Sequence, residues 1–447
     1  MFATILGALL AVTEVLFSFD TEDFTSPAAA EGIKELAQLM SDEGVTAHFV
    51  TVGYLARALR EWGRDDIIEA MKPHIKLFHT RDHSIHPNIL EMSDVKDYNE
   101  IYPKVLAREM EGLRMLRDHL GVTEAWGTVP PGNSDSYVSY YAYAEMGLKI
   151  RGGAWFTDYT KGEDWWFCNL RQIPYLYTWE DFLPPAEFNP DAFLDKLATA
   201  ERTFIFAHPN KVHSLEFWDI LNYKYENLAP YGQWRESPQR DPKDVAEYLN
   251  RIRTLVRRIK SDPRFRIVTV KDLAAREKPR VPIMRADVSR IRRSLLEKFA
   301  PIDNPSWSIS DCFVAAVKFL RGEPRHLPVM AYGFLEKPQG VSSPVQVSAA
   351  DLRAAAANLD IYTFLPPTIK VGEVEIGPAD FLMAALEVLE TGTETVTVVP
   401  RPQLCGYGPF PMLEKLCFKG SWIHSRTMKD DYLSDRLRWQ IWTLRRE

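Results

Sequence analysis

The feature that most constrains the fold is an alternation of short apolar runs with amphipathic stretches, which continues to about residue 278. The apolar runs have the length and composition of buried strands, and the stretches between them have helical spacing. A strand that is followed by a helix and then by another strand predicts a parallel sheet. At this length we expect a (β/α) barrel rather than an open sheet. The predicted strands include EVLFSFD, VTAHFVTVG, IKLFHT, AWGTVP, GLKIRGG, RTFIFAH and FRIVTV.

The 447 residues exceed what one hydrophobic core usually organises, so we expect more than one domain. After residue 278 a basic, proline-containing stretch leads into a helix-rich part with a weak internal repeat, in which ISDCFVAAVKFLRG aligns with GPADFLMAALEVLETG. This part either packs as a cap on the barrel or binds glycans. The predicted division is an apolar segment at 1–14, a barrel at 15–278, a linker at 279–300 and a C-terminal accessory domain at 301–447.

Charge and cysteine content exclude several classes of protein. The chain has 54 Lys and Arg against 61 Asp and Glu, and no basic run, so we expect no nucleic-acid partner. Four cysteines without C-x-x-C spacing form neither a disulfide scaffold nor a zinc knuckle. The opening MFATILGALLAV is too short for a stable membrane span but suits the apolar region of a secretory signal, which favours export over a cytoplasmic location. The sequence fixes no oligomeric state.

Three acids stand in four positions directly behind the first predicted strand, in FSFDTEDF. Strand alternation sends Asp20 and Glu22 to the same face, so their like charges repel unless a cation, a proton or water separates them. The stretch is therefore either a candidate site or a solvated acidic turn ahead of a helix.

Two histidines follow the third predicted strand, in FHTRDHSIHP. His79 and His83 are four residues apart, so a helical turn would project both imidazoles from one face. Imidazole and carboxylate ligands suit Zn²⁺ or a similar divalent ion. Together with the acids at another strand end, the pair predicts a metal site. His48, in contrast, lies inside a predicted strand and is interpreted as a core histidine.

Taken together, these stretches resemble the polysaccharide deacetylase family, also called the NodB-homology domain or carbohydrate esterase family 4. The resemblance spans about residues 15–275. It implies a distorted (β/α) barrel and a metal-dependent hydrolase that removes N-acetyl groups from the amino sugars of a polysaccharide or glycan. The matching motifs are SFDTED for the acids, HTRDHS for the histidines, PPGN for the end of the third motif and FIFAHP for the last motif.

The resemblance implies a role for each matching residue. Asp20 would be the general base and His208 the general acid. Glu22 would be the acidic metal ligand, with Asp23 as its rival, and the metal would be Zn²⁺, with Co²⁺ or another divalent ion as alternatives. The imidazole ligands would be His79 and His83, and the carbohydrate substrate would be contacted by Pro131, Gly132, Trp165 and Phe206.

The chain departs from the family pattern in its third and fourth motifs. Thr128 stands where the family carries an arginine that orients the base, and Arg151 is expected to replace that arginine, with Arg81 and Arg171 next. The acid that tunes His208 is left open among Asp158, Asp164, Glu180 and Asp181. Two other functions stay possible: a related amidohydrolase or O-acetyl esterase on the same fold, or a carbohydrate-binding protein with weakened catalysis.

Overall fold

The fold is described from a computed structural model of the chain. Residues 1–11 of the predicted export segment lie outside the described part, as do Asp158, Asp164, Asp181, Cys405 and Cys417. The structure describes residues 12–133, 136–153, 165–173, 175–180, 183–184, 186–223, 233–400 and 423–446.

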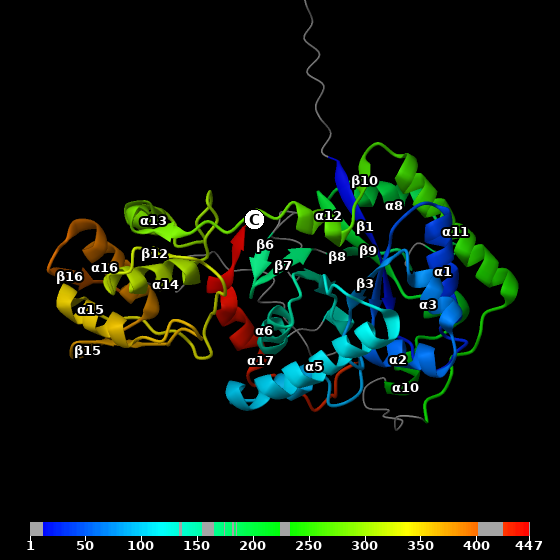
Figure 1. The fold of residues 1–447 in the computed structure, drawn as a ribbon, viewed down its shortest axis with the longest axis horizontal. Helices are drawn as coiled ribbons and strands as arrows, with labels where there is room; N and C mark the ends of the chain where they lie inside the picture. Colours follow the sequence, from blue (N-terminus) through cyan, green and yellow to red (C-terminus); the bar gives the residue numbers. More distant parts are fainter. Residues whose placement is uncertain are drawn as a thin grey trace, which may run out of the picture.

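One large sheet organises the first part of the chain, and most of its neighbouring strands run parallel (Figure 1). Its order is β17-β6-β7-β5-β4-β3-β2-β1-β9-β8, with β10 paired to the start of β1. Among the described strands, the two ends of this order do not pair with each other, so the barrel is distorted rather than closed. The expected distorted (β/α) barrel is confirmed. The strands are β1 (Thr13–Thr21), β2 (His48–Thr51), β3 (Ile75–Phe78), β4 (Gly127–Thr128), β5 (Ile150–Gly152), β6 (Trp165–Phe167), β7 (Leu170–Ile173), β8 (Tyr175–Thr178), β9 (Arg202–Ala207), β10 (Phe265–Ile267) and β17 (Arg445–Arg446).

Strand β1 lies in the middle of the sheet, and every one of its residues is buried. Phe17 and Phe19 stack beside Trp179, with ring centroids 5.4 and 5.6 Å apart. Leu16 faces the other way, into a smaller apolar cluster that includes Val50, Val129 and residues of β3, β5, β7 and β9. Burial on both faces is typical of a central parallel strand and explains its continuous apolar run.

Amphipathic helices cover the sheet (Figure 1). The longest begins at Asp97, whose side chain accepts hydrogen bonds from the backbone of Asn99 and Glu100, and ends at Gly121 with φ of 66°. The predicted core role of His48 is confirmed, because its ring bonds to the Phe17 carbonyl and the Val270 amide. The helices are α1 (Glu31–Asp42), α2 (Gly53–Glu61), α3 (Asp65–Met71), α4 (Ile89–Ser93), α5 (Tyr98–Leu120), α6 (Tyr137–Glu145), α8 (Pro190–Leu197), α9 (Asn210–His213), α10 (Trp218–Tyr223), α11 (Pro242–Ser261) and α12 (Val270–Ala275).

A helix-rich region lies to one side of the sheet (Figure 1). Its two repeat copies are helices α14 and α16, which pack against each other through Phe313 and Phe381. Asp311 and Asp380 hold equivalent places, because each accepts a hydrogen bond from the backbone N–H three residues earlier. The region comprises β11 (Ile283–Met284), α13 (Val288–Glu297), α14 (Ile309–Leu320), β12 (Arg325–His326), β13 (Val345–Ser348), α15 (Ala349–Asn358), β14 (Ile369–Val371), β15 (Val374–Ile376), α16 (Pro378–Thr391) and β16 (Thr395–Val398).

The stretch predicted as a linker, residues 279–300, contains β11 and helix α13. Val288, Ile291 and Leu295 are buried at helical spacing, so this stretch packs as part of the helix-rich region.

The end of the chain returns to the barrel. β17 pairs with β6, and helix α17 (Leu433–Arg438) packs against α6. The Tyr141 hydroxyl donates to the Gln440 side chain at 2.6 Å, and Arg436 bonds to the Tyr137 hydroxyl. The division into 15–278 and 301–447 stays a prediction, but residues 423–446 contribute a strand and a helix to the first unit.

No helix in the described residues is long and apolar enough to cross a membrane.

Candidate metal and catalytic site

Strand register brings the candidate residues together at one edge of the sheet. Ser18, Phe206 and Thr178 pair across β1, β9 and β8. Two residues beyond Ser18, Phe206 and Thr178 stand Asp20, His208 and Glu180, respectively. Because the carboxyl ends of parallel strands meet at one edge, this edge is where polar side chains can gather around a substrate.

A second row leads to the proposed ligands. Thr21 pairs with Thr51, and Thr51 pairs with Phe78, so the residues that follow β1 and β3 are neighbours across β2. These following residues are Glu22 and His79. The sheet thus places the acidic motif beside the first histidine.

Glu22, His79 and His83 form a buried cluster in which the ligand atoms lie within 4.8 Å of one another. Oε2 of Glu22 is 3.1 Å from Nε2 of His79 and 2.9 Å from Nε2 of His83. This is the one such group among the residues that the structure describes. Two imidazoles and a carboxylate match the ligand set of a hydrolytic Zn²⁺ site, in which the fourth position is open to water. The residues present therefore fit a divalent ion.

Each imidazole is oriented by its other nitrogen. Nδ1 of His79 donates a hydrogen bond to the carbonyl of Val129, and Nδ1 of His83 is 2.8 Å from the Ser84 hydroxyl. These bonds turn both Nε2 atoms toward Glu22, as is usual for metal-binding histidines. Burial opposes a charge on Glu22, yet the charge of His83, hydrogen bonds from His79 and His83, and the charge of His208 hold the pKa of its carboxyl well below the usual range.

The turn that carries the two histidines is not helical, which corrects the sequence prediction. Residues 79–83 form an irregular turn, and His83 has the left-handed φ of 56°. The imidazoles converge because the turn folds back on itself, not because they share a helical face. The two histidines do lie together as predicted, but the predicted helical turn between them is absent.

Buried charges on α5 hold this turn in place. Thr80 donates to Glu109 at 3.0 Å, and Arg108 bonds to both Glu109 and Asp82. Burial raises the pKa of the Glu109 carboxyl despite the charge of Arg108. The turn residues between the two histidines are thus tied to one helix by a closed network.

The N-terminus of α2 holds the same turn from the other side. The backbone N–H groups of Gly53 and Tyr54 donate to the carbonyls of Thr80 and Arg81, each at 2.9 Å. Gly112 on α5 lets the turn approach, since a Cβ at that position would lie 2.6 Å from the Cα of Arg81. Any larger residue there would displace the turn that carries the imidazoles.

Of the two rival acids, Asp23 points away from the imidazoles. Its Oδ1 accepts hydrogen bonds from the backbone and hydroxyl of Thr25 at 3.0 and 2.6 Å, and Asn210 approaches its Oδ2 at 3.5 Å. Burial, which these bonds only partly offset, raises the pKa of Asp23 to about 6. Glu22 is the acid that the structure places with His79 and His83.

His208 lies between two carboxylates. Its Nε2 is 3.9 Å from Oδ2 of Asp20, and its Nδ1 is 3.2 Å from both oxygens of Glu180. Glu180 also accepts the backbone N–H of His208 at 2.7 Å. Burial disfavours the imidazolium, but the charge and hydrogen bond of Glu180, with Glu22 and Asp20 behind them, raise the pKa of His208 to about 10. Four acids were candidates for the partner of His208. Among the described residues, Glu180 is the one that contacts its Nδ1.

Two of the four predicted substrate contacts lie near these groups. Phe206 is half-buried, and its ring meets that of His208 edge to face, with centroids 5.7 Å apart. Pro131 lines a small pocket together with His83, Asn88 and residues 423–424. Gly132 follows on the exposed side of this loop with φ of 55°.

Arg151 is fully buried on β5, which three strands separate from β1 in the sheet order. Its guanidinium donates to the carbonyl of Gly153 and lies 6.0 Å from the ring centre of Tyr140. The base-orienting role of Arg151 stays a prediction. Thr128, which replaces the family's arginine, has a buried hydroxyl with no hydrogen-bond partner among the described residues.

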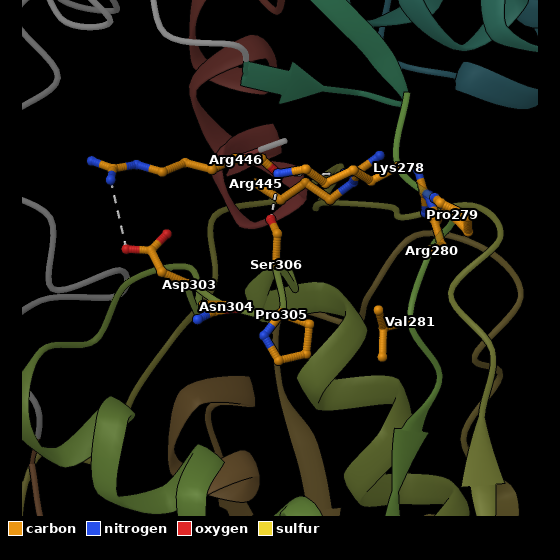
Figure 2. A pocket seen from close by; sticks show the side chains of 10 residues that line it. All are labelled: Lys278, Pro279, Arg280, Val281, Asp303, Asn304, Pro305, Ser306, Arg445 and Arg446. Atoms are coloured by element: carbon orange, nitrogen blue, oxygen red, sulfur yellow. Dashed lines mark hydrogen bonds and ion pairs between the residues drawn. The ribbon is translucent and has the colours of Figure 1, made fainter. Parts of the chain in front are cut away.

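Trp165 lies away from the cluster, on β6, where its ring packs beside Arg446 of β17 at 5.1 Å. Arg446 also lines a separate pocket of about 400 Å³ (Figure 2). There its guanidinium is 3.7 Å from Asp303, and the Ser306 hydroxyl donates to its carbonyl. This pocket marks the junction of residues 278–281 and 303–306 with the chain end, and it contains none of the proposed catalytic groups.

Sequence reasoning missed several residues around the site. Trp218, whose indole N–H donates to Glu22 at 3.1 Å, and the Arg108–Glu109 pair carry no motif, and their place at the site depends on packing between distant segments. His424 is buried beside the turn, where Asn88 approaches its Nδ1 at 2.9 Å. The one sequence signal for Arg108 and Glu109 is their position on the apolar face of a predicted amphipathic helix, where charged residues are unusual.

Comparison with known proteins gives distant likenesses only. No family model and no curated protein matches the chain. A Mycobacterium smegmatis protein described as a polysaccharide deacetylase is 13% identical over 60% of this chain and 90% of its own, with a TM-score of 0.38. The peptidoglycan deacetylase PdaC from Bacillus subtilis is 12% identical over 63% and 97%, with a TM-score of 0.33.

Other matches have different activities. The 4-alpha-glucanotransferase from Thermococcus litoralis is 10% identical over 60% of this chain and 41% of its own, with a TM-score of 0.40. A carbohydrate esterase family 4 pseudoenzyme from Bacillus anthracis is 11% identical over 44% and 54%, with a TM-score of 0.27. Such values carry no argument about activity, which rests on the side chains described above. The chain is similar, in its motifs and among its structural matches, to polysaccharide deacetylases of carbohydrate esterase family 4.

Proposed function

We propose that the protein is a metal-dependent hydrolase that removes N-acetyl groups from the amino sugars of a polysaccharide or glycan. The observation that supports this most is the pairing of two groups at one edge of the sheet. Glu22, His79 and His83 form a buried ligand set, and Asp20, His208 and Glu180 form an adjacent acid–base set. Hydrolysis of an amide needs both.

The ligand set would hold Zn²⁺ or a similar divalent ion through Oε2 of Glu22 and the Nε2 atoms of His79 and His83. When bound, such an ion lowers the pKa of water and polarises a carbonyl. Asp20 is buried at the same edge, and its carboxylate would accept the proton of the attacking water. The bond of His79 to the Val129 carbonyl, the contact of His83 with Ser84 and the turn network keep the imidazoles in place while this proton moves.

His208 would then give a proton from Nε2 to the leaving nitrogen. Glu180, which contacts Nδ1 of His208, favours the charged imidazolium, so the general acid is protonated at neutral pH. An amine leaves only after it has been protonated, whereas an alkoxide of a sugar depends less on a strong proton donor. The protonated His208 therefore favours an N-acetyl over an O-acetyl substrate.

Two alternatives keep the same fold. An O-acetyl esterase or an amidohydrolase on a small substrate would use the same cluster. A carbohydrate-binding protein with weakened catalysis is favoured by one observation, the presence of Thr128 where the family carries an arginine that orients the base. In that case the metal would bind but turnover would be absent.

Release of acetate and of free amine from one substrate panel separates these functions. The panel contains N-acetylated glucosamine oligomers, an O-acetylated xylan and small acetamides, each tested with metal-free protein and after addition of Zn²⁺ or Co²⁺. We expect acetate and amine in equal amounts from the N-acetylated oligomers, only with metal. His213→Ala serves as the matched control, since His213 pairs with Glu35 at 2.6 Å outside the ligand set. Acetate from xylan alone would favour the esterase, and no acetate from any substrate would contradict the proposal.

A further inference from the structure

The two oxygens of Glu22 meet different partners. Oε2 faces the Nε2 atoms of His79 and His83 at 3.1 and 2.9 Å. Oε1 accepts a hydrogen bond of 3.1 Å from the indole Nε1–H of Trp218, which is fully buried on α10. The carboxylate is therefore held from both sides, and only one of its oxygens is turned toward the imidazoles.

The direction of the indole is set by packing and not by Glu22. The ring of Trp218 lies among Phe24, Trp234 and Tyr223, with centroids 5.2, 5.7 and 6.1 Å away. The imidazole of His83 is a further neighbour, with its centroid 5.3 Å away.

The backbone of Trp218 is fixed as well. Asn222 donates from its side-chain amide to the Trp218 carbonyl at 2.8 Å, and its Oδ1 accepts the backbone N–H of Arg235 at the same distance. A donor held this firmly can impose an orientation on a carboxylate, which has freedom to rotate about its last bond.

The chemistry of the indole suits this task. An indole N–H can donate a hydrogen bond but cannot accept one or take up a proton. It therefore competes with a metal for no ligand atom and binds the ionised carboxylate more strongly than the protonated one. A hydroxyl or an amide at this place could instead turn its oxygen toward the cation.

We propose that Trp218 is a positioning residue that keeps a single oxygen of Glu22 turned toward His79 and His83, and so sets the affinity of the site for a divalent cation. This inference rests on the proposed function in one respect, namely that the cluster binds a metal. The competing interpretation is that Trp218 only fills space in an aromatic cluster. In that case its N–H would be dispensable.

The test is a titration of the metal-free full-length chain with Co²⁺, in competition with a chromophoric chelator. Trp218→Phe removes the N–H and keeps an aromatic ring. We expect its Co²⁺ affinity to fall about 10–100-fold, the usual cost of losing a hydrogen-bond partner of a metal ligand. Trp234→Phe is the matched control, because it makes the same change in the same aromatic cluster and leaves the bond to Glu22 in place. Its affinity should stay within about 3-fold of the original chain, below the range expected for the lost bond.

Melting of the metal-free variants separates positioning from folding, because it reports whether both tryptophan replacements disturb the cluster equally. An unchanged Co²⁺ affinity in Trp218→Phe, or an equal loss in Trp234→Phe, would overturn the inference.

The outcome is distinguishable from a failure of the proposed function, because no substrate is used. A chain that binds Co²⁺ with the expected loss in Trp218→Phe, yet releases no acetate, would keep this inference and refute the hydrolase. A chain that binds no Co²⁺ at all would overturn both.

Discussion

The two ends of strand β1 each bury a carboxylate, and they bury it among different partners. At the first end, Glu14 pairs in register with Arg202 on β9 and Arg266 on β10. Arg202 lies 2.5 Å from its Oε2, Arg276 lies 2.5 Å from its Oε1, and Arg266 also bonds to Oε1. Burial opposes the charge of Glu14, but the three guanidinium groups lower its pKa to about 2.

At the other end, Glu22 has two imidazoles and an indole in place of guanidinium groups. Arginine stays charged at all relevant pH values and cannot bind a cation. A neutral imidazole can bind a cation. The same strand therefore carries a carboxylate whose partners suit structure at one end, and a carboxylate whose partners suit a metal at the other. The chemistry of the partners, and not burial, makes the difference.

The largest expected effect follows from removal of an imidazole at the second end. His83→Ala and His79→Ala should each lose the bound metal and reduce acetate release to background, because two ligands hold a hydrolytic ion poorly. The loss should exceed the 10–100-fold typical of hydrogen-bond partners of ligands. Metal analysis of the purified variants, with His213→Ala beside them, checks this. Full metal occupancy in both His79→Ala and His83→Ala would contradict the claim that the Glu22 end of β1 binds a metal and the Glu14 end does not.

Asp20→Asn should abolish proton transfer while metal binding survives. The amide is nearly isosteric but accepts no proton, so kcat should fall about 100–10,000-fold, as is typical for loss of a general base. Measurement of kcat together with metal content separates this from ligand loss. Asp23→Asn is the matched control, because Asp23 bonds to Thr25 and not to the imidazoles. A larger loss in Asp23→Asn than in Asp20→Asn would reverse the assignment.

Glu180→Gln should shift the pH dependence of activity. Glu180 raises the pKa of His208, so its neutralisation lowers that pKa. The acid must be protonated to act, and therefore the alkaline limb of the activity profile should move to lower pH, with a loss of about 10-fold or more at the alkaline side. A profile of kcat/KM against pH measures this. An unchanged alkaline limb would mean that Glu180 does not act on His208.

The smallest effect on activity should come from the first end of β1. Glu14→Gln should leave metal content and kcat unchanged and lower the free energy of unfolding by about 1–3 kcal/mol at pH 7. The folded pKa of about 2 lies below the usual value of 4.5, so this stabilisation is present above about pH 4.5 and is lost as the pH falls toward 2. Urea unfolding of both proteins between pH 7 and pH 3 tests this. A gap that stays constant with pH would show that the charge of Glu14 is not responsible.

Part of the site could be predicted from sequence because it follows strands. Asp20, Glu22, His79 and His208 each stand just after a predicted strand, and parallel strands bring such positions to one edge. The resemblance favoured Glu22 over Asp23, but the physical reason could not be predicted, because it is a local bond from Thr25 that turns Asp23 aside. The order of polar residues along the chain does not report this rotation.

Other features could not be predicted from the sequence because they depend on long-range packing. The choice of Glu180 follows from the register of β8 with β9, which the sequence does not specify. Trp218 reaches Glu22 across 196 positions of the chain. The return of β17 to β6 likewise joins the chain end to a strand that had not been predicted, and so it blurs the expected boundary between the two units.

The most direct test of the central claim is anomalous diffraction at the zinc edge from crystals grown with Zn²⁺. We expect one strong peak per chain, at about 2.0–2.2 Å from each of Oε2 of Glu22 and Nε2 of His79 and His83. The Glu14 end of β1 should show no peak. A zinc peak elsewhere with none at this cluster, or no peak at saturating Zn²⁺, would contradict the account.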